Sequence, residues 1–144
     1  MDDFVGYDVE RIGAIYSDIQ RYIRDFNDLN IDSRDALNDK RNFYATSMIL
    51  FSLLNRVFDL GSEIAIAHNL GIPSTYREIF VLLQKNGLID NDLAKTLIGF
   101  VTYRNLLSHE YHGITAEKLF DLTKKISIVR EFAEQMQTLQ KQQK

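Results

Sequence analysis

The stretch from Ser33 to Leu70 contains no proline and shows no strong helix breaker, so it can form one unusually long helix. Gly71 and Pro73 are the first residues that would end it. Pro73 is the only proline among the 144 residues, and apolar residues elsewhere in the chain recur at spacings of three and four. This pattern predicts an all-helical chain and largely excludes sheet-based folds.

Four shorter amphipathic segments accompany the long one, and each follows a polar residue that can cap a helix N-terminus. The predicted segments cover residues 9–26, 75–86, 91–111 and 116–136. We therefore expect a five-helix up-and-down bundle with one long central helix. Because the chain shows no linker, repeat or low-complexity tract, residues 1–144 are expected to form a single domain.

The composition narrows the possible chemistry. The chain has no cysteine, which excludes thiolate catalysis, thiolate zinc sites and a disulfide framework. No apolar stretch approaches the roughly 20 residues of a membrane span, and the first residues do not resemble a signal peptide. We expect a cytoplasmic protein with no membrane contact.

The net charge of -3 gives no general reason to bind nucleic acid, but the charge is unevenly distributed. Residues 1–39 contain ten acidic and four basic side chains, whereas residues 40–144 contain ten acidic and thirteen basic ones. A polyanion would therefore meet the later helices first.

The predicted long helix is apolar on two faces. One stripe consists of Phe43, Leu50, Leu54, Val57 and Ile64, and the other of Tyr44, Met48, Phe51 and Phe58. The core of the domain can cover one face only. Since soluble monomers rarely leave such a surface exposed, we expect the second stripe to pair with another copy of the chain in a homodimer.

The segment 91–111 contains an arginine where its apolar stripe requires an apolar side chain. The stripe reads Leu93, Leu97, Phe100, Arg104, Leu107 and Tyr111. A charge in this position must be paired, border a cleft or bind an anionic ligand, because its burial alone costs several kcal/mol.

The residues around Arg104 suit a phosphodiester. An arginine can hold two phosphate oxygens and stabilise the charge of a transition state, and His109 can transfer protons near neutral pH. Asn105 and Ser108 are expected to support substrate binding, and no metal or cofactor is required. In the alternative interpretation, Arg104 pairs with an acid such as Glu63 or Glu78, and His109 only ends the helix.

The string RNLLSHEY, from Arg104 to Tyr111, resembles the signature of HepT-type toxins in the HEPN superfamily of helical ribonucleases. The resemblance extends from Arg41 to Phe132. Within it, the stretch from Val57 to Ile89 is similar to the middle section of that family, in which a proline and one further residue, here Pro73 and Ser74, precede a Thr-Tyr-Arg-Glu sequence.

The resemblance implies a HEPN-like bundle and a metal-independent, dimeric endoribonuclease toxin that uses Arg104 and His109 of both protomers to cleave RNA. It also implies that a partner antitoxin, an MntA-like minimal nucleotidyltransferase, silences the toxin by attaching AMP to Tyr111. Arg104 and His109 lie five residues apart, about 140° around a helix, so both can serve one phosphate only if the helix is distorted or the histidine comes from the other chain. A noncatalytic HEPN adaptor that binds a nucleotide or a nucleotidyltransferase remains the alternative.

Overall fold

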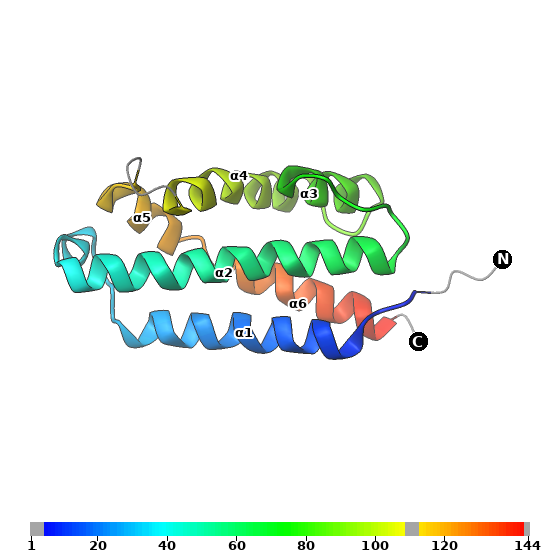
Figure 1. The fold of residues 1–144 in the computed structure, drawn as a ribbon, viewed down its shortest axis with the longest axis horizontal. Helices are drawn as coiled ribbons and strands as arrows, with labels where there is room; N and C mark the ends of the chain where they lie inside the picture. Colours follow the sequence, from blue (N-terminus) through cyan, green and yellow to red (C-terminus); the bar gives the residue numbers. More distant parts are fainter. Residues whose placement is uncertain (1–4, 109–112, 143–144) are drawn as a thin grey trace.

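The computed structural model describes residues 5–108 and 113–142, and in these ranges the chain is helical with no strand (Figure 1). This confirms the predicted fold class. The elements are α1 (Val9–Asp28), the 3-10 helix η1 (Arg34–Asn38), α2 (Lys40–Ala67), α3 (Tyr76–Lys85), α4 (Asn91–Ser108), α5 (Ala116–Thr123) and α6 (Ile126–Gln142). None of the helices in the described ranges is long and apolar enough to cross a membrane.

The central element is α2, the longest helix. Figure 1 shows α1 along one side of it, α3 and α4 along the other, and α6 behind. The apolar stripe of α1 is buried against α2; it consists of Ile12, Ile15, Tyr16, Ile19, Ile23 and Phe26. Because α2 contacts helices on opposite sides, the core buries most of its first apolar stripe and Phe58 of the second, whereas Tyr44 and Met48 of the second stripe stay exposed.

The long helix is shorter at both ends than the sequence predicted. Ser33 caps η1, and the backbone then turns so that the Asp39 carboxylate accepts hydrogen bonds from the first amides of α2. At the other end Asn69 adopts a left-handed conformation with φ of 59°, and its backbone N–H donates to the carbonyl of Ile66. Asn69 therefore ends α2 before Gly71 is reached.

Helix α3 begins and ends at strong local signals. The hydroxyl of Thr75 accepts the capping hydrogen bond from the Glu78 N–H, so α3 begins one residue later than the predicted segment 75–86. Ser74 instead donates to the Glu78 carboxylate through its amide and its hydroxyl. After the C-terminus Gly87 has φ of 74°, a left-handed backbone conformation that glycine adopts readily and that ends the helix.

The prediction of a single last helix was wrong, because the chain turns at Lys124 and Lys125 between α5 and α6. The Thr123 hydroxyl donates to the carbonyl of Phe120, which competes with continued helical hydrogen bonding. Apolar residues nevertheless keep their three-and-four spacing across the turn and remain buried: Leu119, Leu122, Ile126, Val129, Ala133 and Met136. Hydrophobic periodicity alone therefore could not reveal this break.

Helices α2 and α3 approach each other closely at Gly61. A Cβ atom on this buried glycine would lie 2.6 Å from Cγ2 of Ile79 and 3.2 Å from the ring of Phe80. Only glycine fits here without a shift of the Ile79 side chain or of α3. Near this close approach, Tyr76 at the start of α3 stacks on Phe58 in the C-terminal half of α2.

Candidate functional site

Arg104 lies between aromatic rings from two other helices. Leu93, Leu97 and Phe100 of its stripe on α4 are buried, whereas Arg104 is half-buried. Its guanidinium carbon is 5.4 Å from the ring centroid of Phe51 on α2 and 5.1 Å from that of Tyr76 on α3. Cation–π attraction of this kind stabilises a partly desolvated arginine without neutralising it.

A polar side chain on α2 completes the environment of Arg104. The Nε–H of Arg104 donates a hydrogen bond to the side-chain oxygen of Asn55, with an N–O distance of 3.3 Å. Asn55 lies one helical turn after Phe51, so both face α4. Two rings and an amide therefore set the plane of the guanidinium.

The alternative acidic partners proposed for Arg104 are engaged elsewhere. The Glu63 carboxylate pairs with Arg11 at 2.8 Å, and that of Glu78 accepts hydrogen bonds from Ser74. Within the described part of the chain, Arg104 forms an ion pair with neither. The interpretation of Arg104 as a partner of Glu63 or Glu78 is therefore wrong.

Asn55 was missed in the sequence analysis, although a signal for it existed. The second stripe of α2 runs through Tyr44, Met48, Phe51 and Phe58, and Asn55 occupies the position between the last two at the same spacing. It is thus a polar residue in an apolar position, as Arg104 is on α4. Two such exceptions on facing helices can satisfy each other.

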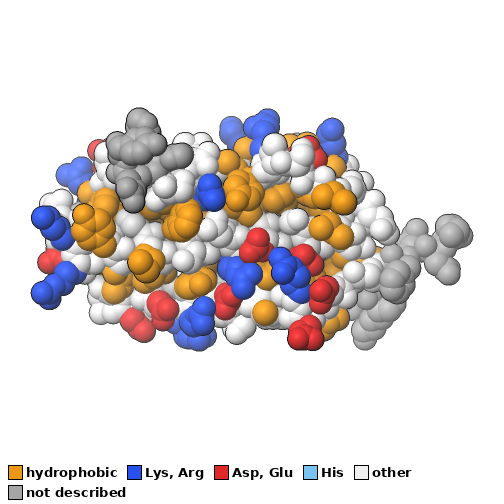
Figure 2. All heavy atoms as spheres, viewed as in Figure 1, with side chains coloured by type: hydrophobic (Ala, Val, Ile, Leu, Met, Phe, Trp, Pro, Cys, Tyr) orange, Lys and Arg blue, Asp and Glu red, His pale blue; other side chains and the backbone are white. Residues whose placement is uncertain are grey.

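The second stripe of α2 is only partly open to solvent. Tyr44 and Met48 are 68% and 73% exposed, whereas Phe58 is fully buried and stacks on Tyr76 with 4.6 Å between ring centroids. Phe58 therefore belongs to the core and not to an unpartnered face. Figure 2 shows hydrophobic side chains in a band across this side of the molecule, between mixed charges over α1 and α2 and basic side chains at the edge of α3 and α4.

The other predicted site residues follow Arg104 in the sequence, and two of them belong to the described part of α4. Asn105 is exposed and lines a cleft, whereas the Ser108 hydroxyl donates to the backbone carbonyl of Asn105 at 3.0 Å. Ser108 is thus engaged with its own helix. His109 and Tyr111 lie outside the described residues.

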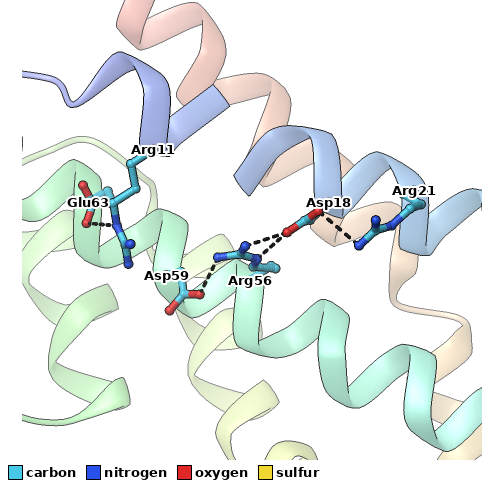
Figure 3. Close-up of polar contacts among 6 residues, drawn as sticks. All are labelled: Arg11, Asp18, Arg21, Arg56, Asp59 and Glu63. Atoms are coloured by element: carbon cyan, nitrogen blue, oxygen red, sulfur yellow. Dashed lines mark hydrogen bonds and ion pairs between the residues drawn. The ribbon is translucent and has the colours of Figure 1, made fainter. Parts of the chain in front are cut away.

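A network of ion pairs connects α1 with α2 (Figure 3). Arg56 contacts Asp18 at 2.6 Å and Asp59 at 3.1 Å, and Asp18 also pairs with Arg21 at 3.1 Å. The hydrogen bond with Asp18 is the main cause that raises the pKa of Arg56. Within residues 5–108 and 113–142, no group of three or more His, Asp or Glu side chains is placed to hold a metal ion.

His68 directly follows the last residue of α2 and contacts the segment that precedes α1. Its Nε2 atom lies 2.6 Å from the Tyr7 hydroxyl, and the two rings meet edge to face. Burial lowers the pKa of His68 and raises the pKa of Tyr7. Both side chains are therefore favoured in their neutral forms.

Comparison with known proteins places this helical arrangement in a family. The model of the family "Ribonuclease HepT-like" matches residues 19–136. The chain belongs to the ribonuclease HepT-like family. The matched residues of this HepT-like chain include Asn55, Tyr76 and Arg104 and the string RNLLSHEY.

The individual proteins that the chain resembles share only a low sequence identity with it. The HepT-like chain is 28% identical over 109 residues to the mRNA nuclease HepT of Shewanella oneidensis, covering 76% of this chain and 71% of that protein. The HepT-like chain is also similar in structure to a tri-AMPylated HEPN toxin of S. oneidensis, which was solved in complex with an MNT antitoxin. The TM-score is 0.81 at 22% identity, and the match covers 96% of this chain and 99% of that toxin. The cytosolic protein YutE of Bacillus subtilis, of unknown function, has a TM-score of 0.78 at 18% identity, with coverage of 96% and 92%. These two structures show the fold that the HepT-like chain shares.

Proposed function

We propose that this chain is the RNA-cleaving toxin of a toxin–antitoxin pair and acts as a metal-independent endoribonuclease. The observation that carries the proposal is the environment of Arg104, a half-buried arginine oriented by Phe51, Tyr76 and Asn55 and without an ion pair to Glu63 or Glu78. Such a cation is placed to bind an anion. Membership of the HepT-like family and the name of the S. oneidensis relative support RNA as the source of that anion.

In the proposed reaction, Arg104 holds the scissile phosphate and stabilises the charge that develops on its oxygens. One His109 imidazole removes the proton of the ribose 2′-hydroxyl, whose oxygen forms a bond to phosphorus. The bond between phosphorus and the 5′-oxygen breaks, and a second, protonated imidazole donates its proton to that oxygen. The products are a 2′,3′-cyclic phosphate and a 5′-hydroxyl, so no redox or metal step is needed.

We propose that the second imidazole comes from another copy of the chain. Arg104 and His109 are five residues apart, about 140° around a regular helix, so one chain does not readily direct both at one phosphate. The exposed Tyr44 and Met48 lie on the same α2 stripe as Phe51, which contacts Arg104. A homodimer that covers these residues would therefore bring two Arg104 sites near each other.

The proposed regulation uses a nucleotidyltransferase antitoxin of the MntA type. Tyr111 is seven residues after Arg104, only about 20° away around a regular helix. AMP attached to the Tyr111 hydroxyl would add a phosphodiester charge that competes with the substrate for Arg104. The S. oneidensis HEPN toxin, which is tri-AMPylated and bound to an MNT antitoxin, supports this proposal.

The decisive experiment is incubation of the purified chain with tRNA and with total RNA in the presence of EDTA. We expect cleavage by the wild-type chain and its loss in Arg104→Ala and His109→Ala. Arg130→Ala, which removes an exposed arginine on α6, is the matched control and should leave cleavage unchanged. If no RNA is cleaved, or if His109→Ala cleaves like the wild type, the endoribonuclease proposal is wrong. The interpretation of the chain as a noncatalytic adaptor is then favoured.

A further inference from the structure

A cleft of about 550 Å³ lies between α2, α3 and α4, beside Arg104. Its apolar lining includes Phe58 and Ile79, which are buried, and Val101, which is half-buried. Ligand sites of this size combine an apolar surface with a few polar groups that fix the orientation of the ligand. The cleft has this composition, because polar side chains from all three helices line it as well.

The polar groups in the cleft are suited to the edges of a nucleobase and to a sugar. Asn105 supplies an amide that can donate and accept, Ser62 supplies a hydroxyl, and Asp59 supplies a carboxylate. Flat bases bind to proteins through an apolar face and hydrogen bonds along the edges, while the ribose presents hydroxyls. The cleft offers both kinds of contact.

The charges around the cleft tolerate a polyanion. The Asp59 carboxylate accepts a hydrogen bond from Arg56 at 3.1 Å, so its charge is compensated (Figure 3). Arg77 lines the same cleft, is exposed, and forms no ion pair within the described ranges. A phosphate that flanks a bound nucleoside would therefore meet a cation rather than an uncompensated acid.

Tyr76 connects the cleft with Arg104. Its ring lies 5.1 Å from the guanidinium carbon and also forms part of the cleft wall. Asn105, the residue after Arg104, lines the cleft as well. We propose that this cleft binds one nucleoside of the RNA substrate, next to the phosphate that Arg104 holds; the inference rests on the function proposed above.

The test compares a variant that fills the cleft with a variant that fills a different groove. Val101→Phe places a ring in the cleft, and Val81→Phe places the same ring in a shallow groove between α3 and α4 from an equally half-buried position. We expect Val101→Phe to lower kcat/KM for RNA about tenfold or more, the size of one lost base contact, and Val81→Phe to leave it within about twofold. Equal effects of the two variants would overturn the proposal.

A second measurement does not depend on cleavage. The ¹⁵N-labelled wild-type chain is titrated with 5′-AMP, 5′-CMP, 5′-GMP and 5′-UMP, and amide shifts are followed by NMR. We expect saturable shifts at Ser62 and Val101 with at least one nucleotide, and their absence in a folded Val101→Phe chain. If Val101→Phe does not fold, Ser62→Leu closes the cleft from α2 instead.

The outcomes separate this proposal from the proposed function. If the chain does not cleave RNA but mononucleotides shift the cleft amides, the ribonuclease proposal fails and the nucleoside site stands. If the chain cleaves RNA and the mononucleotides leave these amides unmoved, the nucleoside site is overturned and the ribonuclease proposal stands. If Val101→Phe loses activity because a dimer dissociates, and if the mononucleotides again leave the cleft amides unmoved, the cleft is a contact between copies of the chain. The nucleoside site is then overturned.

Discussion

The Nε–H of Arg104 on α4 donates a hydrogen bond to the side chain of Asn55 on α2, 49 positions earlier in the sequence. Each residue interrupts an apolar stripe of its own helix. Polar groups in such positions are costly unless they are satisfied, and here each one satisfies the other in part. The hydrogen bond between Asn55 and Arg104 therefore contributes both to the stability of the bundle and to the orientation of the proposed phosphate-binding guanidinium.

Replacement of Asn55 by Asp should separate stability from activity. A carboxylate at this position would form an ion pair with Arg104 in place of the neutral hydrogen bond, so we expect the thermal midpoint to be kept or raised. The same carboxylate would compete with RNA for the guanidinium, and cleavage should fall about tenfold or more, equivalent to about 1.4 kcal/mol. Calorimetry and an RNA cleavage assay on one preparation check both effects. Asn55→Asp with full activity would show that Asn55 does not position Arg104.

Gly61→Ala should destabilise the chain, whereas Gly99→Ala should not. A Cβ atom at Gly61 would clash with buried Ile79, so we expect a loss of about 1–3 kcal/mol, typical of overpacking. Gly99 lies in the middle of α4 with no atom within 4 Å of an added Cβ, and the higher helix propensity of alanine should stabilise it by up to about 1 kcal/mol. Urea denaturation measures both. Equal effects would mean that α3 moves away from α2 without cost.

Met48→Glu should weaken the proposed homodimer. Met48 is exposed on α2, and a charge in the centre of an apolar contact between copies would be desolvated without a partner. Val9→Glu, at an exposed apolar position on α1, is the matched control. Sedimentation velocity should show twice the chain mass for the wild type and for Val9→Glu, and the single chain mass for Met48→Glu. A wild-type monomer at micromolar concentration would contradict the shared site.

The stability of the chain should fall as the pH drops below the ordinary pKa of histidine, partly because of His68. Burial lowers the pKa of His68 in the folded chain, so the unfolded chain binds more protons between that pKa and about 6.5. The contribution of His68 is complete above about pH 6.5 and is lost as the pH falls through its folded pKa. Urea midpoints measured across this range should vary less for His68→Gln than for the wild type. Identical profiles would remove His68 as the cause.

Tyr111→Phe should prevent silencing by the antitoxin, because it deletes the oxygen that would carry AMP while it keeps the ring. Coexpression of the chain with a cognate nucleotidyltransferase, followed by mass spectrometry of the intact protein, should show additions of AMP on the wild type and none on Tyr111→Phe. Cells that carry the antitoxin should be inhibited by the variant. Modification that persists on Tyr111→Phe would place the regulatory site at another residue.

Periodicity predicted the fold class and the central helix because both depend on burial that repeats along the sequence. It did not predict the turn at Lys124 and Lys125, because the buried positions stay in register through the turn. The ends of α2 were also misplaced: Asp39 and Asn69 set them through local hydrogen bonds and a left-handed backbone. Such local effects lie outside a pattern of apolar spacing.

The position of Arg104 on a buried stripe could be predicted, because one helix determines it. Its partners Asn55 and Tyr76 could not be assigned from spacing alone, since they come from α2 and from the start of α3. Their contacts with Arg104 depend on how α2, α3 and α4 pack together, and the close approach of α2 to α3 requires Gly61. The roles proposed for His109 and Tyr111 remain predictions.

The ion pairs between α1 and α2 also affect how an RNA chain would approach. Arg11 and Arg56 are both neutralised by carboxylates, so they add little positive potential on that side, where residues 1–39 are strongly acidic. Arg77 and Lys95, exposed on α3 and α4, lie on the other side of α2. Positive charge is therefore less neutralised on the α3 and α4 side than on the α1 side, and a diffusing polyanion would be attracted toward the Arg104 side. Orientation during diffusion speeds capture in dilute salt, and this advantage fades once mobile ions screen the field.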